Sequence, residues 1–104
     1  MAEGSNMLRR REVTATLLAN RGDLLAISGL GGAIWDVAAA GDVAENFYLW
    51  GAMGGAAPIG LGLALAQPER RVLVIAGDGE MLMGLGGLAT VAVQRPTNLA
   101  IAIL

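Results

Sequence analysis

The residues best suited to chemistry in this sequence are an acidic residue between two glycines, Gly77-Asp78-Gly79. They follow the apolar run Val72–Ala76 and precede a segment with helical spacing, so a strand ends and a helix begins there. Glycine lets backbone N–H groups come close to a ligand, and a helix N-terminus favours phosphate oxygens. A carboxylate would repel a diphosphate unless Mg²⁺ lay between them. The pattern fits an Mg²⁺–diphosphate site, and the alternative is an aspartate that only caps a helix.

A second glycine-rich turn surrounds Met53, in the run Gly51–Gly55, and leads into the apolar segment Ala56–Ala66. Glycines at such a turn allow a ligand to approach the backbone closely. Met53 either contacts the flat ring of that ligand or fills a gap in the core, which methionine often does. The residues alone leave both interpretations open.

A third glycine-rich turn, Gly29–Gly32, follows the short apolar run that ends at Ser28 and suggests dinucleotide binding. It matches only part of the G-x-G-x-x-G pattern, because Ile34 stands at the third glycine position. The pattern also needs an acidic residue about 20 residues later, where Leu49 and Trp50 stand instead. An NAD-binding module is therefore only an alternative, and a P-loop is excluded because the sequence has no lysine.

Strand, glycine turn and helix alternate three times along the chain, and these elements must position the three turns. The expected strands are residues 24–28, 47–49, 72–76 and 98–104, and the expected helices are residues 7–19 (capped by Asn6), 33–40, 56–66 and 81–93. This order predicts an α/β fold, with a parallel sheet flanked by helices on both faces. Ligands of such sheets bind beyond the carboxyl ends of the strands, which is where all three turns fall.

Length and composition limit the domain organisation. The chain has 104 residues, which suits one domain at residues 7–104 after a disordered lead or expression remnant at residues 1–6. Apolar residues make up 55% and charged residues only 15%, so we expect another chain or further sequence to cover part of the surface. An apolar strand that reaches Leu104 would leave an open edge, so we also expect the domain to be truncated there.

Composition excludes several classes of function. With no cysteine and no histidine, the chain cannot supply disulfides, thiolate nucleophiles, histidine bases or zinc sites made of those residues. A net charge of −2 argues against a nucleic-acid partner, and Arg9–Arg11 is too short for a basic patch. The apolar stretch Ala52–Ala66 is shorter than the about 20 residues that span a membrane, so we expect no membrane segment and a cytoplasmic location.

Together, these residues resemble the diphosphate-binding domain of thiamine-diphosphate enzymes over Leu8–Leu104. The motif of that family starts with Gly-Asp-Gly after a strand, as at Gly77–Gly79, and ends in an asparagine that would fall just past Leu104. The stretch Asn46–Pro68 and the run Leu88–Thr90 look like the branch that contains phosphonopyruvate and sulfopyruvate decarboxylases. The Gly-Asp-Gly motif is paired with a Gly-x-Met-Gly turn at the right distance upstream, and this pairing makes the resemblance specific.

The resemblance implies a role for individual residues. Asp78 would be a Mg²⁺ ligand, and the backbone N–H groups of Gly79 and Glu80 would bind the diphosphate at the turn that starts with Gly77. Met53 would be the bulky residue that holds thiamine diphosphate in its bent, reactive shape.

Other residues would meet the two ends of the cofactor. Gly51 would offer its carbonyl to the aminopyrimidine, and Ser28 and Gly29 would lie near the phosphate end. The family often has a small residue where this chain has Glu80. A second carboxylate beside a diphosphate is unfavourable unless it points away or pairs with an arginine.

The activity that the resemblance implies is thiamine-diphosphate-dependent decarboxylation of a small 2-oxo acid of the phosphonopyruvate or sulfopyruvate type. In the family, a glutamate on a pyrimidine-binding domain activates the cofactor, so no catalytic residue is assigned in this chain. We therefore expect the isolated chain to be inactive and to need a pyrimidine-binding domain or subunit in a homo- or hetero-oligomer. The alternatives are an acetolactate-synthase-like or oxidoreductase subunit, and a non-catalytic structural subunit of the same fold.

Overall fold

The computed structural model describes residues 6–104, so the predicted lead lies outside the described residues except for Asn6. Within this range the strands form one four-stranded, all-parallel sheet in the order β2-β1-β3-β4. The strands are β1 Leu25–Ser28, β2 Asn46–Tyr48, β3 Val72–Ala76 and β4 Leu99–Ile103. The helices are α1 Arg10–Leu18, α2 Gly32–Ala39, α3 Ala56–Ala66, α4 Asp78–Met83 and α5 Gly87–Gln94.

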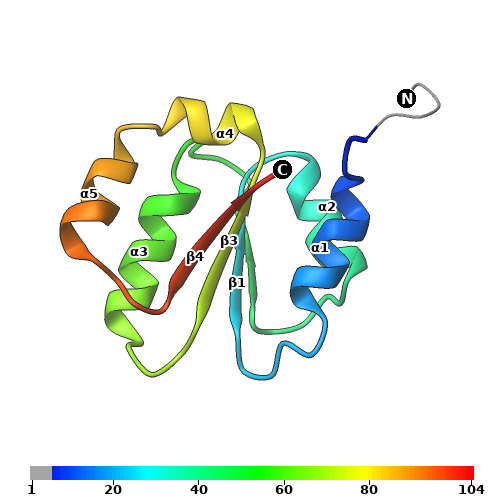
Figure 1. The fold of residues 1–104 in the computed structure, drawn as a ribbon, viewed down its shortest axis with the longest axis horizontal. Coiled ribbons are helices and arrows are strands. Elements are labelled where there is room, and N and C mark those ends of the chain that lie inside the picture. Colours follow the sequence, from blue (N-terminus) through cyan, green and yellow to red (C-terminus); the bar gives the residue numbers. More distant parts are fainter. Residues whose placement is uncertain (1–5) are drawn as a thin grey trace.

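The helices cover both faces of the sheet, which confirms the predicted α/β fold. In Figure 1, α1 and α2 lie on one side of the strands, and α3 and α5 lie on the other. The short helix α4 runs across the end of the sheet to which the strand arrows point. That end carries the carboxyl ends of the strands, where parallel sheets bind their ligands. No helix in residues 6–104 combines the length and the apolar character that crossing a membrane requires.

Strand β3 forms the centre of the core, and all five of its residues are buried. Alternate side chains of a strand point to opposite faces of the sheet. Leu73 and Ile75 accordingly pack with α1 and α2, in a cluster that includes Leu18 and Val37. Val72, Val74 and Ala76 pack on the other face, in a cluster that includes residues of α3. A strand covered on both faces explains why its sequence is continuously apolar.

The first helix starts later than predicted. It begins at Arg10 with Arg9 at its N-cap, so the prediction of Asn6 as the cap was wrong. Leu8 is 75% exposed and therefore adds little to the core. What holds the start of the helix is Asp36, a fully buried carboxylate of α2 that forms ion pairs with Arg10 and, at 3.1 Å, with Arg11.

The helix predicted at residues 81–93 is in fact two helices. Helix α4 already begins at Asp78 and ends at Met83, and α5 begins at Gly87. The break falls at Gly84, whose backbone lies against the backbone of Gly54. The break thus coincides with the contact between the end of α4 and the second glycine turn.

Helix α3 packs tightly on β3 because Gly60 has no side chain. A Cβ at Gly60 would overlap Cγ2 of Val74, which is completely buried and cannot move away. We therefore expect Gly60→Ala to destabilise the protein by about 1–3 kcal/mol, the usual cost of overpacking a core. Urea unfolding of the two proteins measures this difference.

The same helix offers a matched control at Gly62, where a Cβ would meet nothing within 4 Å. Gly62→Ala should stabilise the protein by up to about 1 kcal/mol, because alanine is the better helix former. Equal unfolding midpoints for the two variants would contradict this account of α3 packing.

Candidate functional site

The three glycine turns meet at the carboxyl end of the sheet because their strands are neighbours. Strands β1 and β3 pair in register, with Ser28 opposite Ile75, and the Gly29 N–H donates to the Ile75 carbonyl at 2.8 Å. On the other side of β1, the Leu49 N–H donates to the Ser28 carbonyl at 3.1 Å. The segments that leave β1, β2 and β3 therefore start side by side.

Glu80 connects the three turns directly. Its Oε1 accepts a hydrogen bond from the Leu30 N–H at 3.2 Å, in the Gly29–Gly32 turn. Its Oε2 accepts from the Gly54 N–H at 2.6 Å and from the Ala56 N–H at 3.2 Å, in and just after the second turn. The residue itself follows Gly79 in the Gly77–Gly79 turn and is only 3% exposed. The carboxylate is thus engaged by backbone N–H groups, an arrangement that sequence reasoning did not consider.

Asp78 lies at the surface, as the first residue of α4. Its Oδ1 accepts a hydrogen bond from the Gly79 N–H at 2.8 Å. The N-cap position belongs to Gly77, and no side chain caps this helix, so Asp78 does not act as an ordinary capping residue. An exposed carboxylate at this position remains accessible to a cation.

Met53 lies on a constrained loop between the other two turns. Its neighbours Ala52 and Gly54 both have positive φ angles, +53° and +96°, and such a conformation is costly for alanine. The side chain is 44% exposed, so it does not fill the core. A Cβ placed on Gly79 would lie 3.4 Å from the Met53 Cε, which brings the methionine beside the Gly-Asp-Gly turn.

The remaining predicted residues lie at the same end of the sheet in different environments. The Ser28 side chain is completely buried, and its Oγ has no hydrogen-bond partner among the described residues. Gly29 is also buried, and a Cβ there would come within 2.7 Å of the Glu80 Cγ. Gly51 is exposed, with open space where a Cβ would be. The structure therefore places Gly29 against Glu80 and Met53 beside Gly79, whereas Gly51 has no such close neighbour in the described residues.

Sequence reasoning missed the contact between Gly54 and Gly84. A Cβ on Gly54 would lie 2.9 Å from the Gly84 nitrogen, and a Cβ on Gly84 would overlap the Gly54 carbonyl oxygen. The signal that could have revealed it is the cluster of glycines, Gly84 and Gly86–Gly87, inside an otherwise helical segment.

The donors present at this site suit magnesium better than zinc or calcium. Residues 6–104 contain no group of three or more acidic, cysteine or histidine side chains that could enclose a metal. Mg²⁺ is commonly held by one or two carboxylates together with phosphate oxygens and water. One exposed aspartate beside a ring of glycine turns fits a Mg²⁺ ion that arrives with a diphosphate.

Two other features lie near the carboxyl end of β2. The pKa of the Tyr48 hydroxyl is raised above its usual value, first by burial and then by the hydrogen bond that it donates to Asp42 at 2.7 Å. The hydrogen bond that the side-chain amide of Asn46 donates to this hydroxyl at 3.0 Å acts in the opposite direction. Trp35 and Trp50 form an edge-to-face pair with ring centroids 5.7 Å apart, and both are exposed. Trp50 immediately precedes Gly51, so this pair borders the second turn.

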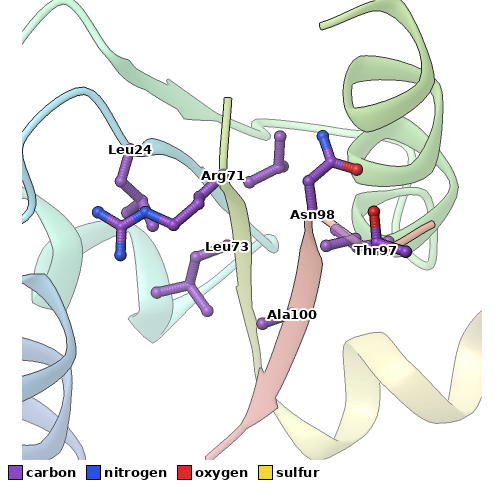
Figure 2. Close-up of a pocket in the computed structure, with 8 residues that line it drawn as sticks. Leu24, Arg71, Leu73, Thr97, Asn98 and Ala100 are labelled. Atoms are coloured by element: carbon purple, nitrogen blue, oxygen red, sulfur yellow. The ribbon is translucent and has the colours of Figure 1, made fainter. Parts of the chain in front are cut away.

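The hollow in Figure 2 lies at the opposite end of the sheet. Its lining includes Arg71 and Leu73 at the start of β3, and Asn98 and Ala100 at the start of β4. The Asn98 amide donates to three carbonyls that end α3 and the following turn, and the Arg71 guanidinium donates to the Arg21 carbonyl. These polar groups are engaged within the fold, so the hollow is not part of the candidate site.

Comparisons with known proteins connect this chain to one enzyme family. The family model described as "Thiamine pyrophosphate enzyme, C-terminal TPP binding domain" matches residues 31–104. The sulfopyruvate decarboxylase subunit beta of Methanothermobacter thermautotrophicus is 47% identical over 98 residues, which cover 94% of this chain and 52% of that protein. The chain thus spans about half the length of this relative.

Two further relatives share shorter segments. The phosphonopyruvate decarboxylase of Streptomyces hygroscopicus is 57% identical over 60 residues, 58% of this chain and 15% of that protein. The acetolactate synthase isozyme 1 large subunit of Escherichia coli is 45% identical over 40 residues, 38% of this chain and 7% of that protein.

Proposed function

Since the chain belongs to the thiamine pyrophosphate enzymes, through their C-terminal TPP-binding domain, we propose that it supplies the Mg²⁺–diphosphate half-site of a 2-oxo acid decarboxylase. The substrate class that we propose is a small 2-oxo acid with an anionic tail, of the sulfopyruvate or phosphonopyruvate type. The names of its relatives support this choice.

The observation that carries the proposal is an exposed Asp78 at a point where three glycine turns converge. Asp78 would hold Mg²⁺, and the backbone N–H groups of Gly79 and Glu80 would bind the diphosphate. Met53, which lies beside Gly79, would support the bend of the cofactor. Gly51 would meet the pyrimidine end, while Ser28 and Gly29 would lie at the phosphate end.

Bound thiamine diphosphate would supply the nucleophilic carbon that adds to the 2-oxo group and the electron sink for the electrons left by CO₂. This chain's own residues would bind and orient the cofactor and exclude water from it, and none of them is assigned as a proton donor or acceptor. The positive φ angles at Ala52 and Gly54 give the loop around Met53 an uncommon shape, and a loop held in this shape would present the methionine to a bent cofactor.

We further propose that a pyrimidine-binding domain or second subunit completes the site and supplies the glutamate that activates the cofactor. Three relatives are named as beta subunits of sulfopyruvate decarboxylase, which supports a hetero-oligomer. We expect the enzyme to be cytoplasmic and the isolated chain to be inactive.

The test is to titrate thiamine diphosphate, with and without Mg²⁺, into the native protein together with its pyrimidine-binding partner. CO₂ release from sulfopyruvate and phosphonopyruvate is then measured in the same sample. Binding that needs Mg²⁺, followed by CO₂ release without C–C bond formation, is the expected result. An acetohydroxy acid product would favour the acetolactate-synthase-like alternative, which the shorter match supports. Absence of binding would indicate a structural subunit.

A further inference from the structure

We propose that Glu80 is a positioning residue whose side-chain carboxylate acts as an internal anion and fixes the three glycine turns around the diphosphate. The inference builds on the proposed function, because the turns are the surface on which the cofactor would bind. It assigns to the side chain a role separate from the backbone N–H of the same residue.

The three hydrogen bonds of Glu80 connect residues that are far apart in the sequence. Their donors lie 50, 26 and 24 residues earlier in the sequence, at Leu30, Gly54 and Ala56. The donors belong to two different turns, and Ala56 is also the first residue of α3. One buried carboxylate therefore joins the Gly29–Gly32 turn to the Gly51–Gly55 turn, beyond the point where the pairing of their strands ends at Ser28.

A carboxylate is the chemical group that this position requires. Three N–H donors converge on two oxygen atoms, and an ionised carboxylate offers acceptors only. Among the described residues, no arginine forms an ion pair with Glu80, so its charge is balanced by backbone N–H dipoles. Glutamine would place an NH₂ group against one set of donors, where two donors would face each other.

The surrounding glycines leave room for this side chain. A Cβ on Gly29 would lie only 2.7 Å from the Glu80 Cγ and 3.3 Å from its Oε1. The absence of a side chain at Gly29 is therefore explained by Glu80 itself. The same carboxylate holds the peptide between Met53 and Gly54, through the short bond from the Gly54 N–H at 2.6 Å. The position of Met53 beside Gly79 thus depends on Glu80.

The first experiment uses Glu80→Gln and Glu80→Ala in the native protein without cofactor, with Glu69→Gln as a control. Glu69 is an exposed carboxylate in the turn after α3, at the opposite end of the sheet. Amide hydrogen exchange should show lost protection at Leu30, Gly54 and Ala56 in both Glu80 variants and no change in the control. Unchanged protection at these three amides in Glu80→Gln would overturn the proposal, even if Glu80→Ala did not fold.

The second experiment adds acetate, or neutral acetamide at the same concentration, to Glu80→Ala. The truncated side chain leaves a space beside three unpaired N–H groups, and a small carboxylate can replace the missing acceptors. Acetate should restore protection and raise the unfolding temperature, while acetamide should not. Equal effects of the two additives would show that Glu80 only fills space and would contradict the role of its charge.

The third measurement connects the carboxylate to the cofactor. Thiamine diphosphate with Mg²⁺ should bind Glu80→Gln about 10- to 100-fold more weakly than the wild type, the usual effect of a group that orients direct ligands. Wild-type affinity in Glu80→Gln would overturn the positioning role. If the wild type itself does not bind the cofactor, the proposed function fails, whereas the exchange and acetate results still decide what Glu80 does.

Discussion

Replacing Asp78 with alanine should abolish Mg²⁺-dependent binding of thiamine diphosphate and leave the fold intact. The side chain is exposed, and within residues 6–104 it accepts a hydrogen bond only from the adjacent Gly79 N–H. Its removal should therefore cost at most about 1 kcal/mol of stability, the size of a favourable charge in a first helical turn. Loss of a direct metal ligand should weaken cofactor binding by more than about 100-fold, beyond the effect of an indirect ligand partner.

Isothermal titration calorimetry with and without Mg²⁺ separates cofactor binding that depends on Mg²⁺ from cofactor binding that does not. Asp78→Asn keeps the shape of the side chain and one oxygen, so it should retain more Mg²⁺-dependent binding than Asp78→Ala. Asp23→Asn is the matched control, because Asp23 is also exposed but lies in the turn before β1, at the other end of the sheet. Cofactor binding that is indifferent to Asp78, or that does not need Mg²⁺, would refute the metal role.

Gly84→Ala should disturb both the stability of the protein and the second turn. Its new Cβ would overlap the carbonyl oxygen of Gly54, so backbone would meet backbone and neither side could relieve the clash by rotating a side chain. We expect a loss of about 1–3 kcal/mol or more on unfolding by urea, as for an overpacked site. Because Gly54 follows Met53, any protein that still folds should also bind thiamine diphosphate more weakly.

Gly86→Ala is the control for this prediction. Gly86 lies two residues further on, has a helical φ of −59°, and would place its Cβ in open space. Gly84 has an ordinary negative φ of −110°, so the difference between the variants isolates steric overlap from backbone strain. If Gly84→Ala is as stable as Gly86→Ala, the close approach of the two turns does not constrain the protein.

The parts of the fold that sequence predicted well are those set by local signals. Helix α3 and strand β3 have the predicted bounds, because Pro68 stops the helix and a continuous apolar run marks a buried strand. The start of α1 and the break between α4 and α5 were predicted wrongly. Both depend on partners far along the chain, Asp36 in the first case and Gly54 in the second.

The candidate site also has parts that the sequence predicted and parts that it did not. Sequence located the three turns and singled out Asp78, because glycines and a carboxylate at strand ends form a recognisable pattern. It did not predict how Glu80 is accommodated, since the partners of its carboxylate are backbone N–H groups. Every residue type except proline carries such a donor, so side-chain identity gives no sign of which ones will converge.

The long reach of the Glu80 hydrogen bonds has a consequence for how the protein folds. A nascent chain that has emerged only as far as α3 contains the first two turns but lacks the residue that joins them. Pairing of distant segments is slow compared with the formation of local helices, because a long loop must close first. The cofactor surface should therefore be among the last parts to form, and a chain that displays it has already completed its β1–β3 pairing.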